Sequence, residues 1–350
     1  MRRNLGRRAF MASAGAAATS LALARRGRAE EKPESLVYST YGGDYGQWVK
    51  EDFEDPFTAA TGIKLIHDIG ENPQRYAKLK TYRERPKVNL IQLQDRFLYE
   101  ATRDGLLEEI DYAKLLHAAP IPPIYRKKTW LGYSVLSIGI IYNRERVAIP
   151  PRQWTDLVDE RYKGRIFIDD FNHFGLHVTL AIAMAQGGGY QDIRPGLKVI
   201  KEIKDRLSPR FISTSQEGMK LLGDGEVDVA MWQSSRAFIL KRKGKPLEYA
   251  VPETGDVAVS YGNAVVKGAG YKEWGEAFID FTADPRLQGK FVSGLFPTTP
   301  THPDALGYAT PEAARLVARP PGAKQIELDY GEVLPRLDEW TKLWNQMIEA

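Results

Sequence analysis

Residues Tyr133–Tyr142, with the sequence YSVLSIGIIY, predict a continuous buried strand in the middle of the chain. Its large aliphatic residues fall at both odd and even positions, so apolar side chains would cover both faces: Val135, Leu136, Ile138, Ile140 and Ile141. A strand that is apolar on both faces is typical of the interior of an α/β sheet. We therefore expect this stretch to cross from one half of the protein to the other.

Alternating strand and helix patterns lie on both sides of this stretch. Before it, Asp44 is a good N-cap and Pro73 opens a second helix, and the predicted strands are residues 35–39, 63–66 and 88–93. After it, the alternation returns, with predicted strands at residues 165–168, 211–212 and 228–232. This repetition predicts an α/β protein with two lobes, each built on a parallel sheet.

A second crossing strand is expected near Gly255–Val266, after which a helix would rejoin the first lobe. The resulting boundaries place residues 30–137 and 262–308 in lobe 1, and residues 138–261 and 309–350 in lobe 2. A C-terminal helix that packs on the surface of lobe 2 is indicated by apolar residues at helical spacing, which are Leu337, Trp340, Leu343, Trp344 and Met347.

The first 29 residues are typical of an export signal. Arg7-Arg8 precede an uncharged stretch at residues 12–24, and two small-residue cleavage patterns follow. The paired arginines before Phe10 indicate the twin-arginine route, which carries folded proteins. We expect a mature protein that is exported to the periplasm.

Removing this segment changes the charge of the chain. The full sequence has 49 basic and 45 acidic side chains, and residues 1–29 hold seven Arg and no acid, so 49 − 7 = 42 bases remain and the net charge falls from +4 to −3. An acidic mature protein argues against nucleic acid as a partner. The absence of cysteine excludes disulfides and a lipid-modified cysteine, so we expect no lipid anchor.

The sequence lacks familiar enzyme motifs. It has no phosphate-binding loop, no HExxH and no GxSxG, and its five His are scattered. His173 and His177 are four residues apart, but no Glu lies between them as a zinc hydrolase would need. We expect neither a metal nor a cofactor.

Four polar loops follow predicted strands, and a fifth precedes the start of a predicted helix. Ligands bind beyond the carboxyl ends of strands in open α/β sheets, although each loop alone is also what an ordinary helix cap requires. Five such loops from two lobes favour a cleft site, and they are residues 40–45, 94–96, 169–173, 213–216 and 232–236.

Several longer stretches carry a family resemblance: FTAATGIKL (57–65), GLLEEID (105–111), IGIIYNR (138–144), WTDLVDERYKGRI (154–166) and GDGEVDVAMW (223–232). The chain resembles the extracellular solute-binding proteins of ABC importers, in the group that includes spermidine/putrescine-binding proteins. The resemblance implies the two-lobed type II periplasmic-binding-protein fold, with a ligand cleft between lobes joined by two crossing strands. It also implies that the lobes close on a solute and dock on a membrane permease.

The resemblance places particular residues in the cleft. The family's cleft Trp falls on Trp232, as an aromatic platform for the ligand, and its acidic loop falls on Asp169-Asp170. The first-lobe loop falls on Thr40–Asp44. Where polyamine binders carry an Asp beside the second crossing strand, this chain has Tyr261. A dication needs carboxylates around each ammonium group, because burying an unpaired charge is costly.

The charges of the loops predict the ligand class. Arg236 and Arg96 present planar forks that match a carboxylate or phosphonate. Acidic candidates for an ammonium group are Asp44, Asp95 and Asp170, and neutral or switchable partners are Tyr41, His173, Thr214 and Tyr261. We expect a carboxylate-bearing or zwitterionic solute, and a true spermidine/putrescine binder is the alternative.

The sequence therefore predicts a monomeric periplasmic receptor that captures a small organic solute and delivers it to an ABC permease in the inner membrane, with no bond chemistry. Two other classes stay open. An exported glycosidase-like enzyme would pair Asp169 or Asp170 with Asp95. A solute sensor would present its closed form to a membrane receptor kinase.

Overall fold

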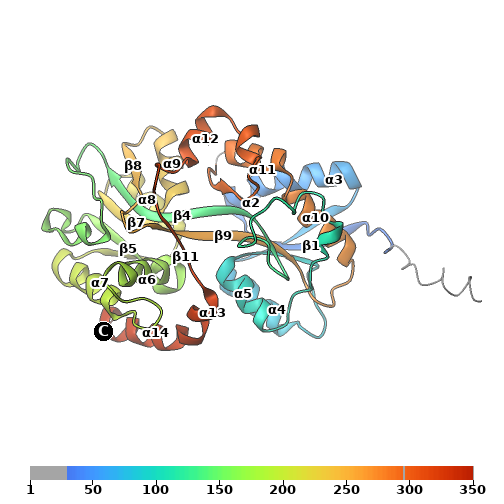
Figure 1. Cartoon of the computed structure of the whole chain (residues 1–350), viewed down its shortest axis with the longest axis horizontal. Coiled ribbons are helices and arrows are strands. Elements are labelled where there is room, and N and C mark those ends of the chain that lie inside the picture. The colour runs from blue at the N-terminus through green and yellow to red at the C-terminus, as the bar shows by residue number, and fades with distance from the viewer. Residues whose placement is uncertain (1–29, 295, 350) are drawn as a thin grey trace, which may run out of the picture.

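Two long strands run between the two halves of the molecule, β4 (Leu131–Asn143) and β9 (Asp256–Val265) (Figure 1). The computed structural model describes residues 30–294 and 296–349, so the predicted export signal lies outside the described residues. Every residue of β9 is buried, as are all residues of β4 except Tyr142. The prediction of a buried crossing strand at residues 133–142 is confirmed.

Lobe 1 is the half that holds the first three strands. Its elements are β1 (Ser35–Thr40), α2 (Gly43–Val49), η1 (Lys50–Glu54), α3 (Asp55–Thr61), β2 (Lys64–Ile69), α4 (Asn72–Thr81), β3 (Leu90–Gln94), α5 (Asp95–Arg103), α10 (Lys272–Thr282), α11 (Pro285–Ser293) and β10 (Thr299–Pro300). Helix α3 ends at Gly62, which adopts a left-handed φ of 76° as a helix C-terminus favours. One face of the sheet packs through Tyr38 on Phe278, with ring centroids 5.1 Å apart. The other face packs on α4 and α5.

Lobe 2 repeats the alternation of strands and helices. Its elements are β5 (Ile166–Asp169), η5 (Phe171–Gly175), α6 (Leu176–Ala185), α7 (Arg194–Leu207), β6 (Arg210–Ile212), α8 (Ser215–Gly223), β7 (Val229–Gln233), α9 (Ser234–Arg242) and β8 (Leu247–Ala250). Strand β5 pairs in parallel with β6 and β7, as the α/β pattern predicts.

The crossing strands join both lobes into one sheet, whose main order is β2-β1-β3-β9-β4-β7-β5-β6. Strand β4 pairs with β9 in an antiparallel register that sets Val135 opposite Ser260. Beyond this shared segment, β9 continues to pair with β3 in lobe 1, and β4 continues to pair with β7 and β8 in lobe 2. Two strands that belong to both halves are the connection that the sequence predicts.

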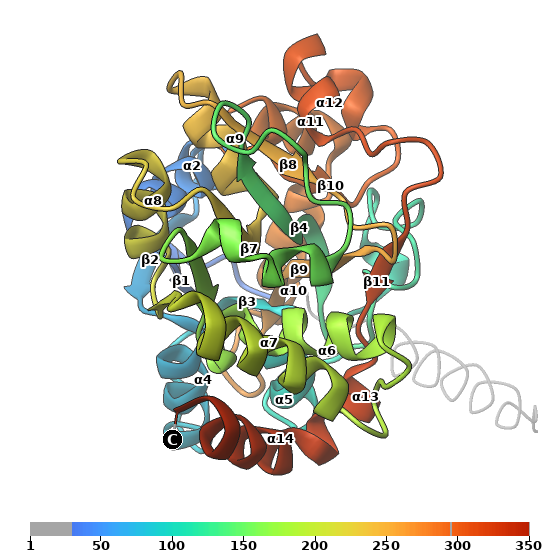
Figure 2. The same ribbon diagram turned by 90° about the vertical axis from the view of Figure 1, so that its left-hand side faces the viewer.

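The C-terminal part lies along both lobes as α12 (Pro311–Val317), β11 (Gln325–Glu327), α13 (Tyr330–Val333), α14 (Leu337–Trp344) and η8 (Asn345–Glu349). Helix α14 packs on lobe 2, where the Trp344 and Phe171 rings lie 5.2 Å apart, and Figure 2 shows it below α7. Helix α12 instead buries Ala313 and Val317 against Val292 of α11. The boundary at residue 309 is therefore wrong for α12, which packs on lobe 1.

Short 3-10 segments complete the described part: η2 (Tyr112–Lys114), η3 (Trp154–Val158), η4 (Glu160–Tyr162), η6 (Ala305–Tyr308) and η7 (Leu334–Arg336). Among residues 30–294 and 296–349, no helix has the length and apolar character needed to cross a bilayer.

Candidate ligand-binding site

Three tyrosines that are far apart in sequence form a compact cluster, which we call the tyrosine cluster: Tyr41, Tyr45 and Tyr261. Tyr41 and Tyr45 flank the start of α2 at the carboxyl end of β1, and Tyr261 lies on β9 opposite Gln94. Their ring centroids are 5.3 to 5.7 Å apart. The fold therefore brings the predicted residues Tyr41 and Tyr261 together, and it adds Tyr45.

The hydroxyls of the cluster are held by neutral partners. Tyr41 donates to Asn72 Oδ1 over 2.6 Å, and Gln94 Nε2 donates to the Tyr261 hydroxyl over 3.2 Å. Burial raises the pKa of all three phenols above the ordinary value of tyrosine. The cluster is therefore uncharged at physiological pH and presents polar hydroxyls on apolar rings.

Arg236 approaches this cluster from lobe 2. It lies in the first turn of α9, and its guanidinium carbon is 5.2 Å from the centroid of Phe296. Phe296 in turn packs edge-on against Tyr45, with centroids 4.8 Å apart. Arg236 therefore faces the lobe 1 side of the site from the opposite lobe.

The charge of Arg236 has no paired carboxylate among the described residues. Its Nε is buried and has no hydrogen-bond partner. Burial lowers the pKa of the guanidinium, and the nearby Tyr261, Tyr45, Asp44 and Glu71 act in the opposite direction. A partly buried cation without a counterion is costly by itself, so an anionic group in this position would stabilise it.

The start of α9 adds further donors beside Arg236. Its N-cap residue, Gln233, makes no capping bond and donates its side chain to Ser215 Oγ over 3.2 Å. The backbone N–H groups of the first turn are thus free of a side-chain cap, and such groups bind anions. The hydroxyl of Ser235 is buried and also has no partner.

Two acidic residues lie on the lobe 1 side of Arg236. Asp44 is exposed in the first turn of α2, and it stays a candidate partner for an ammonium group. Glu71, at the N-cap of α4, is exposed as well and is near enough to influence the pKa of both Arg236 and Tyr261. We did not predict Glu71 from the sequence, although it follows the end of β2 and the rule of polar residues after strands would have found it.

Asp95 is engaged in the structure itself. Its Oδ2 accepts from the Ser260 N–H over 2.9 Å, and its Oδ1 accepts from Arg96 N–H and from the Tyr330 hydroxyl. The residue is 7% exposed, and burial raises its pKa to about 6. Both carboxylate oxygens are occupied, so the prediction of Asp95 as a solute contact is wrong, and the residue ties α5 to β9.

Arg96 is also paired within the protein. Its Nε donates to Glu100 Oε1 over 3.0 Å, one turn along α5, and 12% of its side chain is exposed. An anionic ligand would have to compete with this carboxylate. Arg96 therefore already has a carboxylate partner within the protein.

The two carboxylates of the acidic loop of lobe 2 have different partners. Asp169, at the end of β5, is buried and lies 2.8 Å from His173 Nδ1, and burial raises its pKa. Asp170 caps η5 by accepting from Asn172 N–H. The His173 side chain keeps 26% exposure and is held by Asp169, so it remains a candidate contact.

Two other predictions do not fit the structure. Trp232 is 0% exposed, because it packs edge-on against Phe167 and under Gly218. It is a core residue of lobe 2, so the prediction of an aromatic platform at Trp232 is wrong. Thr214 is exposed but accepts from Glu217 N–H over 3.3 Å as the N-cap of α8. Helix capping therefore accounts for the threonine at this position without a ligand.

No group of three or more His, Asp or Glu side chains converges as a metal site would within the described ranges. The arrangement that remains is a cation and an uncapped helix start from lobe 2, facing neutral tyrosines and two carboxylates from lobe 1. Such a site can hold a small molecule by both of its charged ends.

Comparison with known proteins places the chain among binding proteins. It is 23% identical to the gamma-aminobutyric acid-binding protein of Pseudomonas aeruginosa, over 91% of this chain and 94% of that protein. It is 24% identical to the spermidine/putrescine-binding periplasmic protein 1 of Haemophilus influenzae, over 60% of this chain and 61% of that protein.

A solved structure shows the same fold. It is a binding protein of Agrobacterium tumefaciens in complex with agropinic acid, with a TM-score of 0.74 and 23% identity, covering 91% of this chain and all of that one. The predicted two-lobed type II periplasmic-binding-protein fold is thereby confirmed. Residues 85–318 match the family model described as bacterial extracellular solute-binding protein, and the chain belongs to this family of ABC-transporter solute-binding proteins.

Proposed function

We propose that this protein is exported to the periplasm, captures a small zwitterionic or carboxylate-bearing solute between its lobes, and delivers it to an ABC permease as a monomer. Capture requires contacts from both lobes, because a ligand stabilises the closed state only through contacts that form on closure. Arg236 on lobe 2 and the tyrosine cluster with Asp44 and Glu71 on lobe 1 supply such contacts.

The observation that carries the ligand class is the unpaired Arg236. Its buried Nε lacks a partner, and no carboxylate pairs with its guanidinium among the described residues. A carboxylate or phosphonate would accept from the planar fork in a bidentate manner and would also meet the uncapped N–H groups of α9. Asp44 and Glu71 would hold an ammonium group at the other end of the solute.

The two named relatives bind different kinds of molecule. Gamma-aminobutyrate has a carboxylate and an ammonium group, whereas spermidine and putrescine carry only cations. A bare polyamine would place a positive charge near Arg236, and Tyr261 is neutral. The charges of the site therefore favour the zwitterion over the polyamine.

Binding of a defined panel to the purified mature protein tests this proposal. Isothermal titration and thermal shift would compare gamma-aminobutyrate and 2-aminoethylphosphonate with putrescine and spermidine. We expect saturable binding of at least one zwitterion and no binding of either polyamine. The ligand class is overturned if a polyamine alone binds, and the receptor function fails if a broad solute library gives no binding.

A role without bond chemistry is supported by the state of the acidic residues. Asp95 has both oxygens occupied by hydrogen bonds, and Asp169 is paired with His173, so neither is free as a general acid or base in this arrangement. Recovery of the intact solute after incubation with the protein would agree with binding alone. Any product in that experiment would indicate an enzyme.

A further inference from the structure

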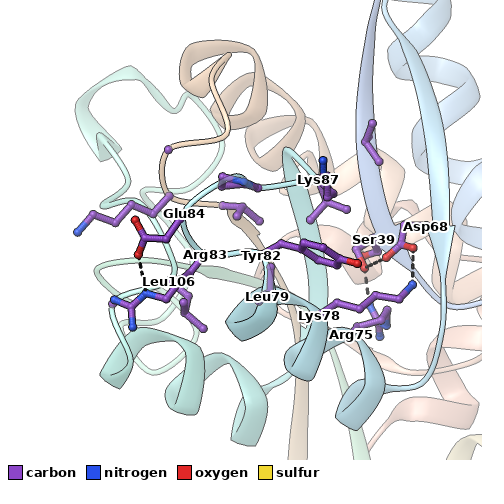
Figure 3. Close-up of a pocket in the computed structure, with 17 residues that line it drawn as sticks. Ser39, Asp68, Arg75, Lys78, Leu79, Tyr82, Arg83, Glu84, Lys87 and Leu106 are labelled. Carbon is purple, nitrogen blue, oxygen red and sulfur yellow. Dashed lines mark hydrogen bonds and ion pairs between the residues drawn. The ribbon is translucent and has the colours of Figure 1, made fainter.

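A cavity lies in lobe 1, and Figure 3 shows the side chains that line it. Its volume is about 630 Å³, within the range of small-molecule sites. It lies between α4, the α4–β3 connection, the strands β1 and β2, and the turn after β9. Its lining includes neither Arg236 nor any member of the tyrosine cluster, so it is separate from the candidate solute site.

The cavity exists because part of the sheet has no helix over it. Val37 and Ser39 of β1 are in register with Ile66 and Asp68 of β2, and these four residues share one face of the sheet. Parallel sheets are normally covered on both faces, yet Ile66 on this face is 53% exposed. Helix α4 covers the neighbouring strands and leaves an open floor beside it.

The lining combines an apolar floor with excess positive charge. Leu79, Leu106 and Val266 are each at least nine-tenths buried and form part of the floor. Five basic side chains line the cavity, and they are Arg75, Lys78, Arg83, Lys87 and Lys267. The lining is therefore amphipathic and basic.

Its two acidic side chains are already paired. Lys78 Nζ lies 2.5 Å from Asp68 Oδ1, and Arg83 Nε lies 3.4 Å from Glu84 Oε1. The described residues provide no ion-pair partner within 4.0 Å for the other three cations, Arg75, Lys87 and Lys267. With five basic and two acidic side chains, the lining carries a net charge of 5 − 2 = +3.

Arg75 is the least exposed of these cations. It is 0% exposed and donates only to uncharged acceptors, the carbonyls of Ser39 and Gln92 and the side chain of Asn72. Its Nε is buried without a partner. A buried guanidinium without a carboxylate is costly, and a ligand anion in the cavity would reduce this cost.

Arg75 also stands between the cavity and the candidate solute site. Its guanidinium carbon lies 4.1 Å from the ring centroid of Tyr41, a member of the tyrosine cluster. Asn72, to which Arg75 donates, accepts from the Tyr41 hydroxyl as well. The two sites thus share one buried side chain as a partition.

We propose that this cavity is a second binding site, which takes a small organic monoanion with an apolar body, such as an aryl or alkyl carboxylate. The apolar body lies on Val37, Leu79 and Val266. The anionic group meets the positive field of Lys87, Lys267 and Arg75. A polar zwitterion suits the solute site, and this second ligand belongs to a different chemical class.

Titration with 4-phenylbutyrate and its uncharged amide, 4-phenylbutyramide, tests the proposal. We use Arg236→Ala protein as the background, so that anion binding at the solute site is weakened and the substitutions below can separate the two sites. Calorimetry should give saturable one-to-one binding of the acid, with the amide about tenfold weaker because it lacks the charge. The absence of saturable binding of the acid at millimolar concentration would overturn the proposal.

Substitutions at the rim locate the binding. Lys87→Glu combined with Lys267→Glu should weaken the acid by about tenfold or more and leave the amide unchanged. Lys243→Glu combined with Lys245→Glu is the matched control, since it changes the net charge equally at exposed positions of lobe 2. Equal weakening by both pairs would mean that only net charge matters, and would overturn the site.

A filling substitution gives an independent measurement. Val88→Trp places a ring in the cavity and should abolish binding of the acid and the amide alike. Thermal melts test whether each variant folds. If the Val88→Trp protein does not fold, the Lys87→Glu, Lys267→Glu pair alone tests the location of the site. Undiminished binding to a folded Val88→Trp protein would contradict the assignment.

Discussion

The hydroxyl of Tyr330 donates to Asp95 Oδ1 over 2.9 Å, which joins the C-terminal segment to the start of α5 in lobe 1. The same hydroxyl lies 3.1 Å from His177 Nε2 on α6 of lobe 2. Since Tyr330 donates to Asp95, the imidazole N–H donates to Tyr330 in this arrangement. A buried chain of three side chains therefore connects the two lobes, and its protonation bears on stability.

Asp95 makes the protein less stable as the pH rises. Its folded pKa of about 6 lies above the usual 3.8, because burial disfavours the carboxylate more than its hydrogen bonds favour it. The folded state therefore holds the proton more tightly, and the stability from Asp95 is fully present below pH 3.8 and is lost as the pH rises through 6. The loss amounts to at most about 3 kcal/mol.

Urea unfolding of the wild type and of Asp95→Asn between pH 4 and 8 measures this contribution. Asn does not titrate, so the unfolding free energy of the wild type should fall relative to that of Asp95→Asn as the pH rises from 4 to 8. A difference that stays constant with pH would show that Asp95 does not titrate there.

His177 acts in the opposite direction. Burial lowers its pKa from 6.5 to about 3, with Arg96 and His173 as further causes, so the folded state excludes the proton. The stability from neutral His177 is present above pH 6.5 and is lost as the pH falls toward 3. His177→Gln should therefore flatten the loss of stability on acidification, measured by urea unfolding at pH 4 and pH 7. An unchanged acid limb would contradict the prediction.

Arg236→Ala should separate binding from stability. Removal of the cation should weaken zwitterion binding by about 30-fold, or about 2 kcal/mol, because it truncates one partner of a charged contact. The free protein should melt at an equal or higher temperature, since a partly buried charge without a carboxylate partner is gone. Calorimetry measures the affinity and thermal melts measure the stability. An unchanged affinity would contradict the assignment of Arg236 as the anion contact.

Arg236→Lys refines this test. It keeps the positive charge but removes the planar fork, so binding should be intermediate between the wild type and Arg236→Ala. Wild-type affinity in the Lys variant would mean that the charge alone acts.

Glu71→Gln should weaken a zwitterion by about fivefold to tenfold, because it removes a negative charge beside the expected ammonium group. A simple carboxylate without an ammonium group should bind this variant as well as before or better. Glu217→Gln, an exposed acidic position on α8, is the control of equal charge. Equal effects of the two substitutions on zwitterion affinity would remove Glu71 from the site.

Gly218→Ala should destabilise lobe 2 by about 1–3 kcal/mol. A Cβ at this position would lie 2.8 Å from the buried ring of Trp232, which cannot move away easily. Solute affinity of the folded variant should change little, because Trp232 contributes to the core and not to the ligand. A large loss of affinity without loss of stability would indicate that Trp232 contributes to ligand binding.

Residue type and periodicity predicted most of the fold. The aliphatic run at residues 133–142 is β4, and the strand at residues 35–39 is β1 within one residue. Local pattern suffices here because strand, cap and glycine signals act within a few residues. Helix α12 was assigned to the wrong lobe, because the contact of Ala313 and Val317 with Val292 is tertiary.

The candidate site was predicted less completely. Polar residues after strand ends pointed to Tyr41, Asp44 and Arg236, which the fold sets around one region. The sequence does not show which polar groups already have partners within the protein. Asp95 and Thr214 accept hydrogen bonds from backbone N–H groups, and the ring of Trp232 packs against Gly218. These three side chains therefore have partners within the protein.

The sequence by itself determined the α/β class, the two crossing strands and the family resemblance, because these depend on the order of apolar and polar residues along the chain. Only the tertiary structure decided which charges stay unpaired. Arg236 and Arg75 are both arginines near strand ends or helix starts, yet Arg236 faces lobe 1 from lobe 2, whereas Arg75 lines a cavity within lobe 1. Pairing depends on distances between segments far apart in sequence, and packing alone sets those distances.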